Sequence, residues 1–316
     1  MPDTIATPAV PAVAIPPAPF KISDAFLIPV EEGQAVNKGW PARHGGRPLG
    51  VTWHWAVTRK LSVLTQVLGG AHAERKGKAS AHYGVGRSFA EGVHRYVSLE
   101  NRSWHAGINQ TLRWNGAALA DDADFKGSRS TIGIETSHIG ANVDGIVAGP
   151  DWIRTATPLG KPILVQPWTD EQIAMCIEVG REIVRRWPHI RPQDHHGHHD
   201  ICPVDPQGRA YKIDVCGFPF AKVLRGIYDN ASIPDVWTPL ETVRQRQRAL
   251  IALGFDLGRT GADGSWGPRS TAALRLFQRH QGLVPNGLWS TFVSRAVHDE
   301  LAENGRVLAQ VTAGPL

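Results

Sequence analysis

The sequence is poor in cysteine and has no long apolar run. Only three of its 316 residues are cysteines, at positions 176, 202 and 216. A small, odd number of thiols excludes a disulfide framework and is typical of a protein that folds in a reducing cytoplasm. No stretch approaches the roughly 18 consecutive apolar residues that a membrane-spanning helix needs, so we expect no membrane insertion.

The first residues of the sequence do not have the pattern of a secretion signal, so we expect none. Residues 1–20, MPDTIATPAVPAVAIPPAPF, are apolar but have no basic segment ahead of the apolar part, and their prolines would interrupt a signal-peptide helix. We interpret this segment as a flexible Pro/Ala-rich arm. The sequence therefore predicts a protein made in the cytoplasm without a signal peptide.

Runs of basic residues are absent as well, although the formal net charge is +5. A mildly basic surface suits a polyanion such as nucleic acid or an acidic cell-wall polymer. The lysines and arginines are scattered, and no RNA-binding motif of aromatic and basic residues occurs. A cell-wall polymer is therefore favoured over nucleic acid as the partner.

Histidine, in contrast, is concentrated in residues 195–218, HHGHHDICPVDPQGRAYKIDVCGF. Further side chains that can bind a metal follow the four histidines: Asp200, Cys202, Asp205, Asp214 and Cys216. Imidazole with a carboxylate or thiolate is the ligand set of Zn²⁺, and a catalytic zinc keeps a fourth position for water. An exposed histidine loop would not explain the Lys212-x-Asp214 pair after a turn-rich loop. If this stretch supplies two ligands, the third comes from elsewhere in the chain.

His54 is a candidate for that third ligand. It lies between two tryptophans in residues 49–57, LGVTWHWAV, an apolar run that predicts a buried strand. Most histidines in such runs are core residues with a satisfied hydrogen bond. A strand residue beside a pocket is nevertheless held firmly enough to be a metal ligand. The residues alone leave both interpretations open.

Two further segments offer candidate site residues. Residues 130–138, STIGIETSH, predict a strand, and Glu135 lies just past its apolar part, as an edge charge or as a general base. Trp104 and His105 stand where a predicted strand gives way to a loop, a common place for substrate contacts. A tryptophan packed under a loop would look the same in the sequence.

Helical patterns flank these segments. The clearest covers residues 169–187, where Thr169 and Gln172 form a capping-box pattern and Pro188 follows the end. Shorter helices are expected at 61–68 and 218–228. Residues 108–130 are expected to form a long loop flanking the site, and residues 139–167 to be irregular.

The composition changes near residues 233–239, IPDVWTP, which we interpret as a linker. No lysine occurs from Trp237 onward. Three short helical patterns follow, at 240–253, 270–281 and 289–301, separated by Gly/Asp turns. Such a short unit can bury only a small core, which makes it more plausible as a binding module than as a catalyst.

Six motifs in this chain occur in the order typical of one enzyme family: WHW (53–55), SAH (80–82), WHAG (104–107), TIGIE (131–135), GHHDI (197–201) and Lys212-x-Asp214. In these motifs, residues 45–220 resemble the zinc-dependent N-acetylmuramoyl-L-alanine amidases of the type-2 family, to which peptidoglycan recognition proteins are related. Separately, DGSWGPRSTAALRLFQ (263–278) resembles the signature of the three-helix peptidoglycan-binding domain, with Asn286-Gly287 at its second turn.

The resemblance implies an α/β fold in which helices flank a central mixed β-sheet, followed by a small three-helix all-α domain. The implied division is an arm (1–20), a catalytic domain (21–232), a linker (233–239), a peptidoglycan-binding domain (240–305) and a tail (306–316).

The resemblance also implies a set of site residues. Zn²⁺ would be bound by His54, His198 and Asp214, with Lys212 stabilising the oxyanion and Glu135 as the base. Trp104 and His105 would line the substrate groove. Some relatives use a tyrosine as base at the position that is Ala81 here, so Glu135 is expected to act alone.

Two alternatives to this ligand set stay open. The interval between His198 and Lys212 is longer than the family pattern, which implies an insertion near residues 204–211. Asp205 or Cys216 could then replace Asp214. His196 and His199 compete with His198, which Gly197 and the following Asp200-Ile201 favour.

The function implied is hydrolysis of the amide between N-acetylmuramic acid and L-alanine in peptidoglycan. The enzyme would be a monomeric phage endolysin or an autolysin, which reaches the wall after release from the cytoplasm. The alternatives are a zinc peptidase that cuts stem peptides and a recognition protein without catalysis.

Overall fold

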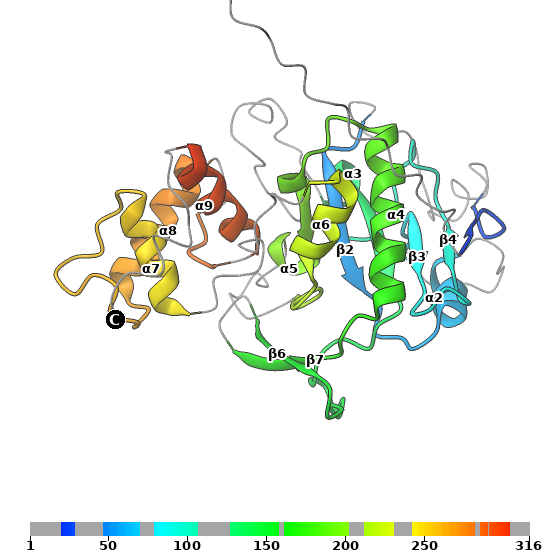
Figure 1. Cartoon of the computed structure of the whole chain (residues 1–316), viewed down its shortest axis with the longest axis horizontal. Helices are drawn as coiled ribbons and strands as arrows, with labels where there is room; N and C mark the ends of the chain where they lie inside the picture. The colour runs from blue at the N-terminus through cyan, green and yellow to red at the C-terminus, as the bar shows by residue number, and fades with distance from the viewer. Residues whose placement is uncertain are drawn as a thin grey trace, which may run out of the picture.

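A six-stranded mixed sheet forms the centre of the larger part of the molecule (Figure 1). The structure is a computed structural model, and it describes residues 20–28, 47–69, 79–106, 127–157, 161–201, 212–230, 242–281, 285–289 and 291–303. The predicted arm, linker and tail, most of the predicted 108–130 loop and the predicted insertion lie almost entirely outside these residues. The domain boundaries stay a prediction.

The strand order of the sheet is β1 (Ile22–Ser23), β4 (Val93–Arg95), β3 (Tyr83–Val85), β5 (Thr131–Thr136), β2 (Gly50–Trp55) and β8 (His195–Gly197). Only β3 and β4 pair antiparallel, and the other neighbours are parallel. The central strands β2 and β5 are buried along almost their whole length, which explains their apolar sequences. The predicted α/β fold with a central mixed sheet is confirmed.

Alternation along the strands divides the side chains between the two faces of the sheet. Trp53, Tyr83 and Ile134 belong to the main hydrophobic core, together with residues of the long helix α4. Successive strand residues point to opposite faces, so His54 and Glu135 point away from that core. Because His54 is paired with Glu135 in the register of β2 and β5, the two side chains are cross-strand neighbours.

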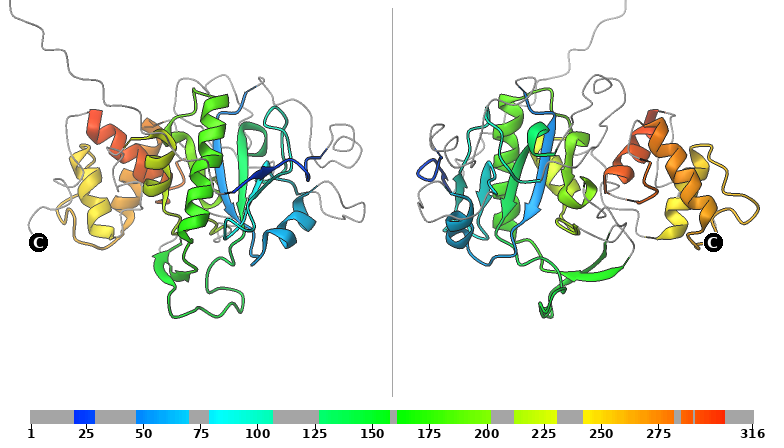
Figure 2. Two further views of the ribbon diagram at one scale, coloured as in Figure 1. Left: turned by 45° about the vertical axis from the view of Figure 1, so that its right-hand side comes forward. Right: turned by 180° about the vertical axis from the view of Figure 1, so that it is seen from behind.

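Helix α4 (Asp170–Arg186) covers the face of the sheet that carries Trp53 and Ile134, and it lies next to α6 (Phe220–Tyr228) (Figures 1 and 2). The Thr169 hydroxyl accepts a hydrogen bond from the Gln172 N–H, as the capping box predicts. The Gln172 side chain instead donates to the Ser137 carbonyl at 3.1 Å, so it ties the helix to the end of β5. Two glycines, Gly180 and Gly226, bring α4 and α6 close together: each faces an isoleucine of the other helix.

The other face is partly covered by α2 (Leu61–Leu68), which packs on β3. Its Leu61, Leu64 and Leu68 form a small core with Tyr96. A Cβ at Gly84 in β3 would lie 2.2 Å from the Tyr96 hydroxyl oxygen, so a glycine is needed for this packing. The short helix predicted over 61–68 is confirmed.

A hairpin corrects the expectation that residues 139–167 are irregular. Strands β6 (Ile153–Ala156) and β7 (Pro162–Val165) pair antiparallel and extend from the body of the molecule (Figure 1). Their turn residues lie outside the described part of the chain. The strands are short, and the Gly- and Pro-rich sequence around them hides their alternation. The remaining elements of this part are single turns: α3 (Gly127–Ser130), η1 (Pro192–Asp194) and α5 (His198–Ile201).

Three helices follow, as predicted: α7 (Val243–Ala252), α8 (Pro268–His280) and α9 (Thr291–Glu303). They share a core of their own that includes Leu250, Leu274 and Phe277. Within the part of the chain that the structure describes, no helix is long and apolar enough to cross a membrane.

Helix α9 is the element that joins these helices to the sheet. It contacts the edge strand β8 and η1. Arg295 of α9 is fully buried, and its guanidinium carbon lies 5.0 Å from the centre of the Phe220 ring in α6. Ala106 and Leu49 of the larger part pack with the core of the three helices. The two parts are therefore in direct contact through apolar and cation–π interactions.

We predict that Gly180→Ala lowers the free energy of unfolding by about 1–2 kcal/mol. A Cβ at this position would lie 2.2 Å from Cδ1 of Ile227. Overpacking costs about 1–3 kcal/mol, and alanine contributes only about 1 kcal/mol of helix propensity over glycine. Urea denaturation measures the change. The Gly180→Ala/Ile227→Val double variant, which removes that Cδ1, should recover part of the loss; a single variant more stable than wild type would contradict the packing argument.

Candidate active site

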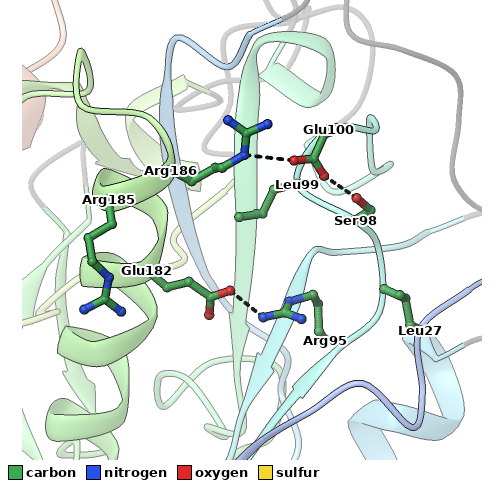
Figure 3. A pocket seen from close by; sticks show the side chains of 8 residues that line it. All are labelled: Leu27, Arg95, Ser98, Leu99, Glu100, Glu182, Arg185 and Arg186. Atoms are coloured by element: carbon green, nitrogen blue, oxygen red, sulfur yellow. Dashed lines mark hydrogen bonds and ion pairs between the residues drawn. The ribbon is translucent and has the colours of Figure 1, made fainter.

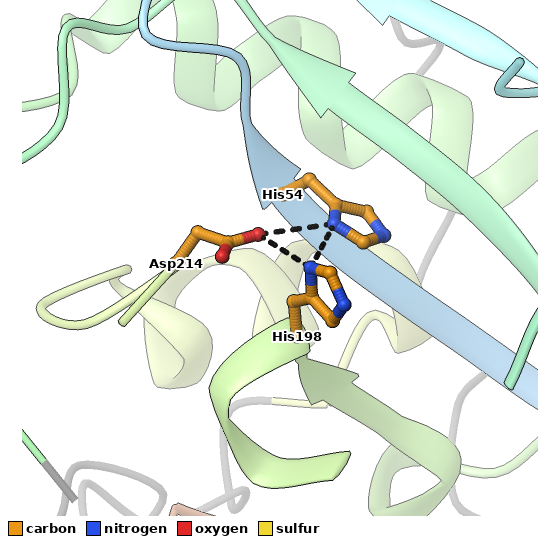
Figure 4. A group of neighbouring side chains, drawn as sticks. All are labelled: His54, His198 and Asp214. Atoms are coloured by element: carbon orange, nitrogen blue, oxygen red, sulfur yellow. Dashed lines mark hydrogen bonds and ion pairs between the residues drawn. The ribbon is translucent and has the colours of Figure 1, made fainter. Parts of the chain in front are cut away.

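His54, His198 and Asp214 meet on the face of the sheet that is turned away from α4 (Figure 4). Nδ1 of His54 lies 3.1 Å from Nδ1 of His198, and Oδ2 of Asp214 lies 3.0 Å from each of these nitrogens. All three side chains are buried. We call these residues the triad. Of the histidines and acids proposed from the sequence, the structure brings these three together.

The local folding explains why these residues meet. His54 is near the end of β2, and the register of β2 and β8 pairs Trp53 with Gly197, so His198 begins α5 directly beside His54. The N–H of His199 donates a hydrogen bond to the Asp214 carbonyl. This bond holds the segment that carries Asp214 against α5.

The electrostatics of the triad suit a metal ion. Burial, followed by the charge of His198, lowers the pKa of His54 to about 4, although Asp214 opposes this shift. Burial opposes ionisation of Asp214, but the charge and hydrogen bonds of both histidines outweigh it and hold the pKa of Asp214 well below its usual range. His54 is therefore neutral and Asp214 ionised at pH 7, which are the protonation states that metal ligands need.

Glu135 lies beside the triad. Its Oε1 is 4.0 Å from Nδ1 of His54, and its side chain is 15% exposed. Oε2 is buried and forms no hydrogen bond with any described residue. Burial, followed by the negative charge of Asp214, raises the pKa of Glu135 to about 8, against the opposing charge of Lys212. A cation bound by the triad would favour the ionised form of this carboxylate.

Lys212 is half-buried at the other end of the Lys-x-Asp pair. Its positive charge acts on both Glu135 and His54. Lys212 is therefore one of the charged groups that influence both the triad and the candidate base.

Trp104 and His105 occupy different positions. Trp104 is half-buried, and the guanidinium carbon of Arg102 lies 4.5 Å from the centre of its ring. His105 is buried behind His54, and the nearest nitrogens of the two rings are 3.0 Å apart. The substrate role of both residues stays a prediction.

The other candidate ligands have different surroundings. Cys216 is buried in the main hydrophobic core, and Nε2 of His196 is hydrogen-bonded to the Thr52 hydroxyl at 2.7 Å. The His199 ring lies against Gly197, where a Cβ would be 2.6 Å from the ring. Asp205 lies outside the described residues. Ala81 is buried in the small core with α2.

Two residues of β5 support the site although they are not among the predicted site residues. Thr131 and Gly133 contact the His105 ring, and a Cβ at Gly133 would lie 2.3 Å from Cγ of that ring. A glycine inside a strand often indicates that another group packs closely against the main chain, and Gly133 is such a glycine in the TIGIE motif. The motif does not indicate which group approaches.

A separate hollow of about 490 Å³ lies beside α4 (Figure 3). Arg95, which lines it, is paired with Tyr83 in the sheet register, so the hollow is on the α4 side and not on the side of the triad. Arg95 forms ion pairs with Asp24 and Glu182, and Arg186 pairs with Glu100 at 3.0 Å. Its charged side chains are thus largely satisfied by one another, and we assign it no chemistry.

Comparison with known proteins identifies two families along the chain. Residues 44–209 match the family described as N-acetylmuramoyl-L-alanine amidase, and residues 240–295 match a peptidoglycan binding domain. A comparison with curated protein sequences yields no match.

Several solved structures are similar to the chain at low identity. AmpDh3 from Pseudomonas aeruginosa is 19% identical, with 84% of this chain and 94% of that chain covered and a TM-score of 0.42. AmiD from E. coli, in complex with anhydro-N-acetylmuramic acid-L-Ala-D-gamma-Glu-L-Lys, is 20% identical, with the same coverage and a TM-score of 0.42. The PlyG catalytic domain is 13% identical, with 67% and 99% covered and a TM-score of 0.40.

The match of residues 44–209 extends over more than half of the chain and includes His54, Glu135 and His198. The second match covers α7 and α8 completely and the start of α9. Both match the sequence motifs that predict a peptidoglycan amidase with a peptidoglycan-binding domain. The chain belongs to the N-acetylmuramoyl-L-alanine amidase family, and it is a hydrolase of peptidoglycan.

Proposed function

We propose that the chain binds one Zn²⁺ through Nδ1 of His54, Nδ1 of His198 and Oδ2 of Asp214. The observation that carries the proposal is the triangle of these atoms, with sides of 3.0–3.1 Å. All three can offer a lone pair to a common point, and two imidazoles with a carboxylate form a known catalytic zinc set. The ligand atoms of a zinc site lie slightly farther apart than these three, so a small expansion of the triangle would accommodate the ion.

Zinc at this position would lower the pKa of a water and polarise a carbonyl group. The protein's own residues then supply the proton transfers. Glu135 is the base in our proposal because it lies beside the triad and its buried Oε2 has no hydrogen-bond partner among the described residues. It accepts a proton from the attacking water and passes it to the leaving amine of L-alanine.

Lys212 has the second catalytic role. Attack on the amide carbonyl develops negative charge on its oxygen, and a positioned cation stabilises that charge. The charge of Lys212 lowers the pKa of both Glu135 and His54, which supports a role for Lys212 beside the reacting groups. A good donor in such a position contributes roughly 3–4 kcal/mol to catalysis.

The bond cleaved is the amide between the lactyl group of N-acetylmuramic acid and L-alanine, and the helices α7–α9 bind the polymer. Binding to an insoluble polymer raises the local concentration of the bonds to be cleaved. We further propose that the protein is a monomeric endolysin or autolysin, made in the cytoplasm and acting after release to the wall. A purely recognising relative is disfavoured because all three triad positions carry metal-binding side chains.

We predict that Glu135→Gln lowers kcat on purified peptidoglycan by about 10²–10⁴-fold, because general acid–base catalysis is lost. The variant should still bind one zinc. Mass spectrometry of the products and metal analysis of the protein check both statements. Glu100→Gln, on the α4 side of the sheet, is the matched control and should stay within a few-fold of wild type. Stem peptides that do not begin with L-alanine would establish a peptidase instead.

We predict that zinc removal abolishes hydrolysis, and that one equivalent of Zn²⁺ restores it. Dialysis against a chelator followed by titration with zinc measures this, with released peptides as the readout. Asp214→Asn should weaken zinc binding strongly, because a neutral amide replaces the only anionic ligand. Undiminished product release from protein shown to be free of metal would overturn the zinc proposal.

A further inference from the structure

We propose that His105 is a positioning residue that fixes His54 as the Nε2–H tautomer, so that the Nδ1 lone pair of His54 points to the metal. This inference rests on the zinc site proposed above. It concerns the far side of the His54 ring, where Nε2 lies 3.0 Å from Nδ1 of His105. Metal-binding histidines commonly donate their second ring N–H to a partner that sets the tautomer. Here the partner is another imidazole.

The direction of the hydrogen bonds follows from their last acceptor. Nε2 of His105 lies 3.3 Å from the main-chain carbonyl oxygen of Thr131, which can only accept, and 3.4 Å from the Thr131 hydroxyl, which can accept as well as donate. Because the shorter of the two contacts needs a donor, we assign the hydrogen of His105 to Nε2 and the accepting lone pair to Nδ1. His54 must then donate through Nε2, which leaves its Nδ1 without a hydrogen.

The surroundings of His105 engage both nitrogens of its ring. The ring is 9% exposed; Nδ1 faces the His54 ring, and Nε2 faces the carbonyl and the hydroxyl of Thr131. A buried ring with both nitrogens engaged is held in one orientation.

The packing leaves the His105 ring little freedom. The ring lies against Gly133, where a Cβ would be 2.3 Å from its Cγ. It meets the His54 ring edge-on, with ring centres 5.2 Å apart and an angle of 80° between the planes. Thr131, Gly133 and Glu135 share one face of β5, so a single strand provides the acceptor, the space for the ring and the candidate base.

Buried hydroxyl groups extend this arrangement across the sheet. The Thr131 hydroxyl lies 2.7 Å from the Thr52 hydroxyl, which in turn lies 2.7 Å from Nε2 of His196. The chain of contacts thus links β5, β2 and β8 beneath the triad. His198 differs, because its Nε2 forms no hydrogen bond with a described residue. His105 therefore acts on one ligand of the triad and not on both.

The test compares zinc affinity in His105→Ala and His105→Asn. Asparagine can place its Oδ1 near the position of Nδ1 and still accept from His54, whereas alanine cannot. We expect a zinc dissociation constant about 10–100-fold higher for His105→Ala, and within a few-fold of wild type for His105→Asn. Competition with a chromophoric chelator measures the constants. His138→Ala is the matched control. His138 is also a buried histidine, but its hydrogen bonds to described residues go to the main chain of Gln166 and Gly140.

A second measurement reports the tautomer itself. Long-range ¹H–¹⁵N correlation spectra of the metal-free protein should show the hydrogen of His54 on Nε2 in wild type and in His105→Asn. In His105→Ala, hydrogen on Nδ1 should become detectable. Gly133→Ala, which displaces the ring without removing it, serves if His105→Ala does not fold, and should weaken zinc binding in the same way.

Two results would overturn the inference: zinc binding by His105→Ala as tight as in His138→Ala, or no rescue by His105→Asn. Neither result contradicts the proposed zinc site, because the wild-type protein would still bind the ion. A wild-type protein that binds no zinc contradicts the proposed function instead. In that case the tautomer of His54 in the spectra still decides whether His105 positions it.

Discussion

The pairing of β2 with β5 is the interaction on which the site depends. It sets His54 opposite Glu135, so the proposed metal ligand and the proposed base come from neighbouring strands whose main chains are fixed by the same ladder of hydrogen bonds. A shift of the register by one residue would turn both side chains into the hydrophobic core beneath α4. The hydrophobic core therefore stabilises this register, because Trp53 and Ile134 cannot leave the core without a large loss of buried apolar surface.

The parts of the fold that follow from local chemistry could be predicted from the sequence. Helix α4 has a capping threonine, regular apolar spacing and a proline after its end, and the apolar runs of β2 and β5 indicate buried strands. The β6–β7 hairpin could not, because its strands are short and their pairing depends on contacts with the rest of the chain. The side chain of the capping residue Gln172 was also not predictable, because it donates a hydrogen bond to the distant Ser137 carbonyl and not to its own helix.

The site could be predicted as far as its residues belong to sequence motifs of the family. The resemblance to the family predicts His54, His198 and Asp214 as metal ligands, and in the structure one possible ligand atom of each lies in a common triangle. The support behind them was not predictable. The contact of His105 with His54 joins residues 51 positions apart and requires Gly133 on a third segment, so no spacing in the sequence encodes it. Such contacts arise only when the strands are assembled.

The buried Arg295 has a consequence for how the enzyme meets its polymer. Arg295 is fully buried and packs on the Phe220 ring, and its helix α9 contacts β8 and η1. Separating α9 from the sheet would break this cation–π contact, which is worth about 2 kcal/mol at a site without water. The contact therefore restrains the orientation of the three helices relative to the sheet, and a polymer bound to these helices would reach the triad in a restricted set of orientations.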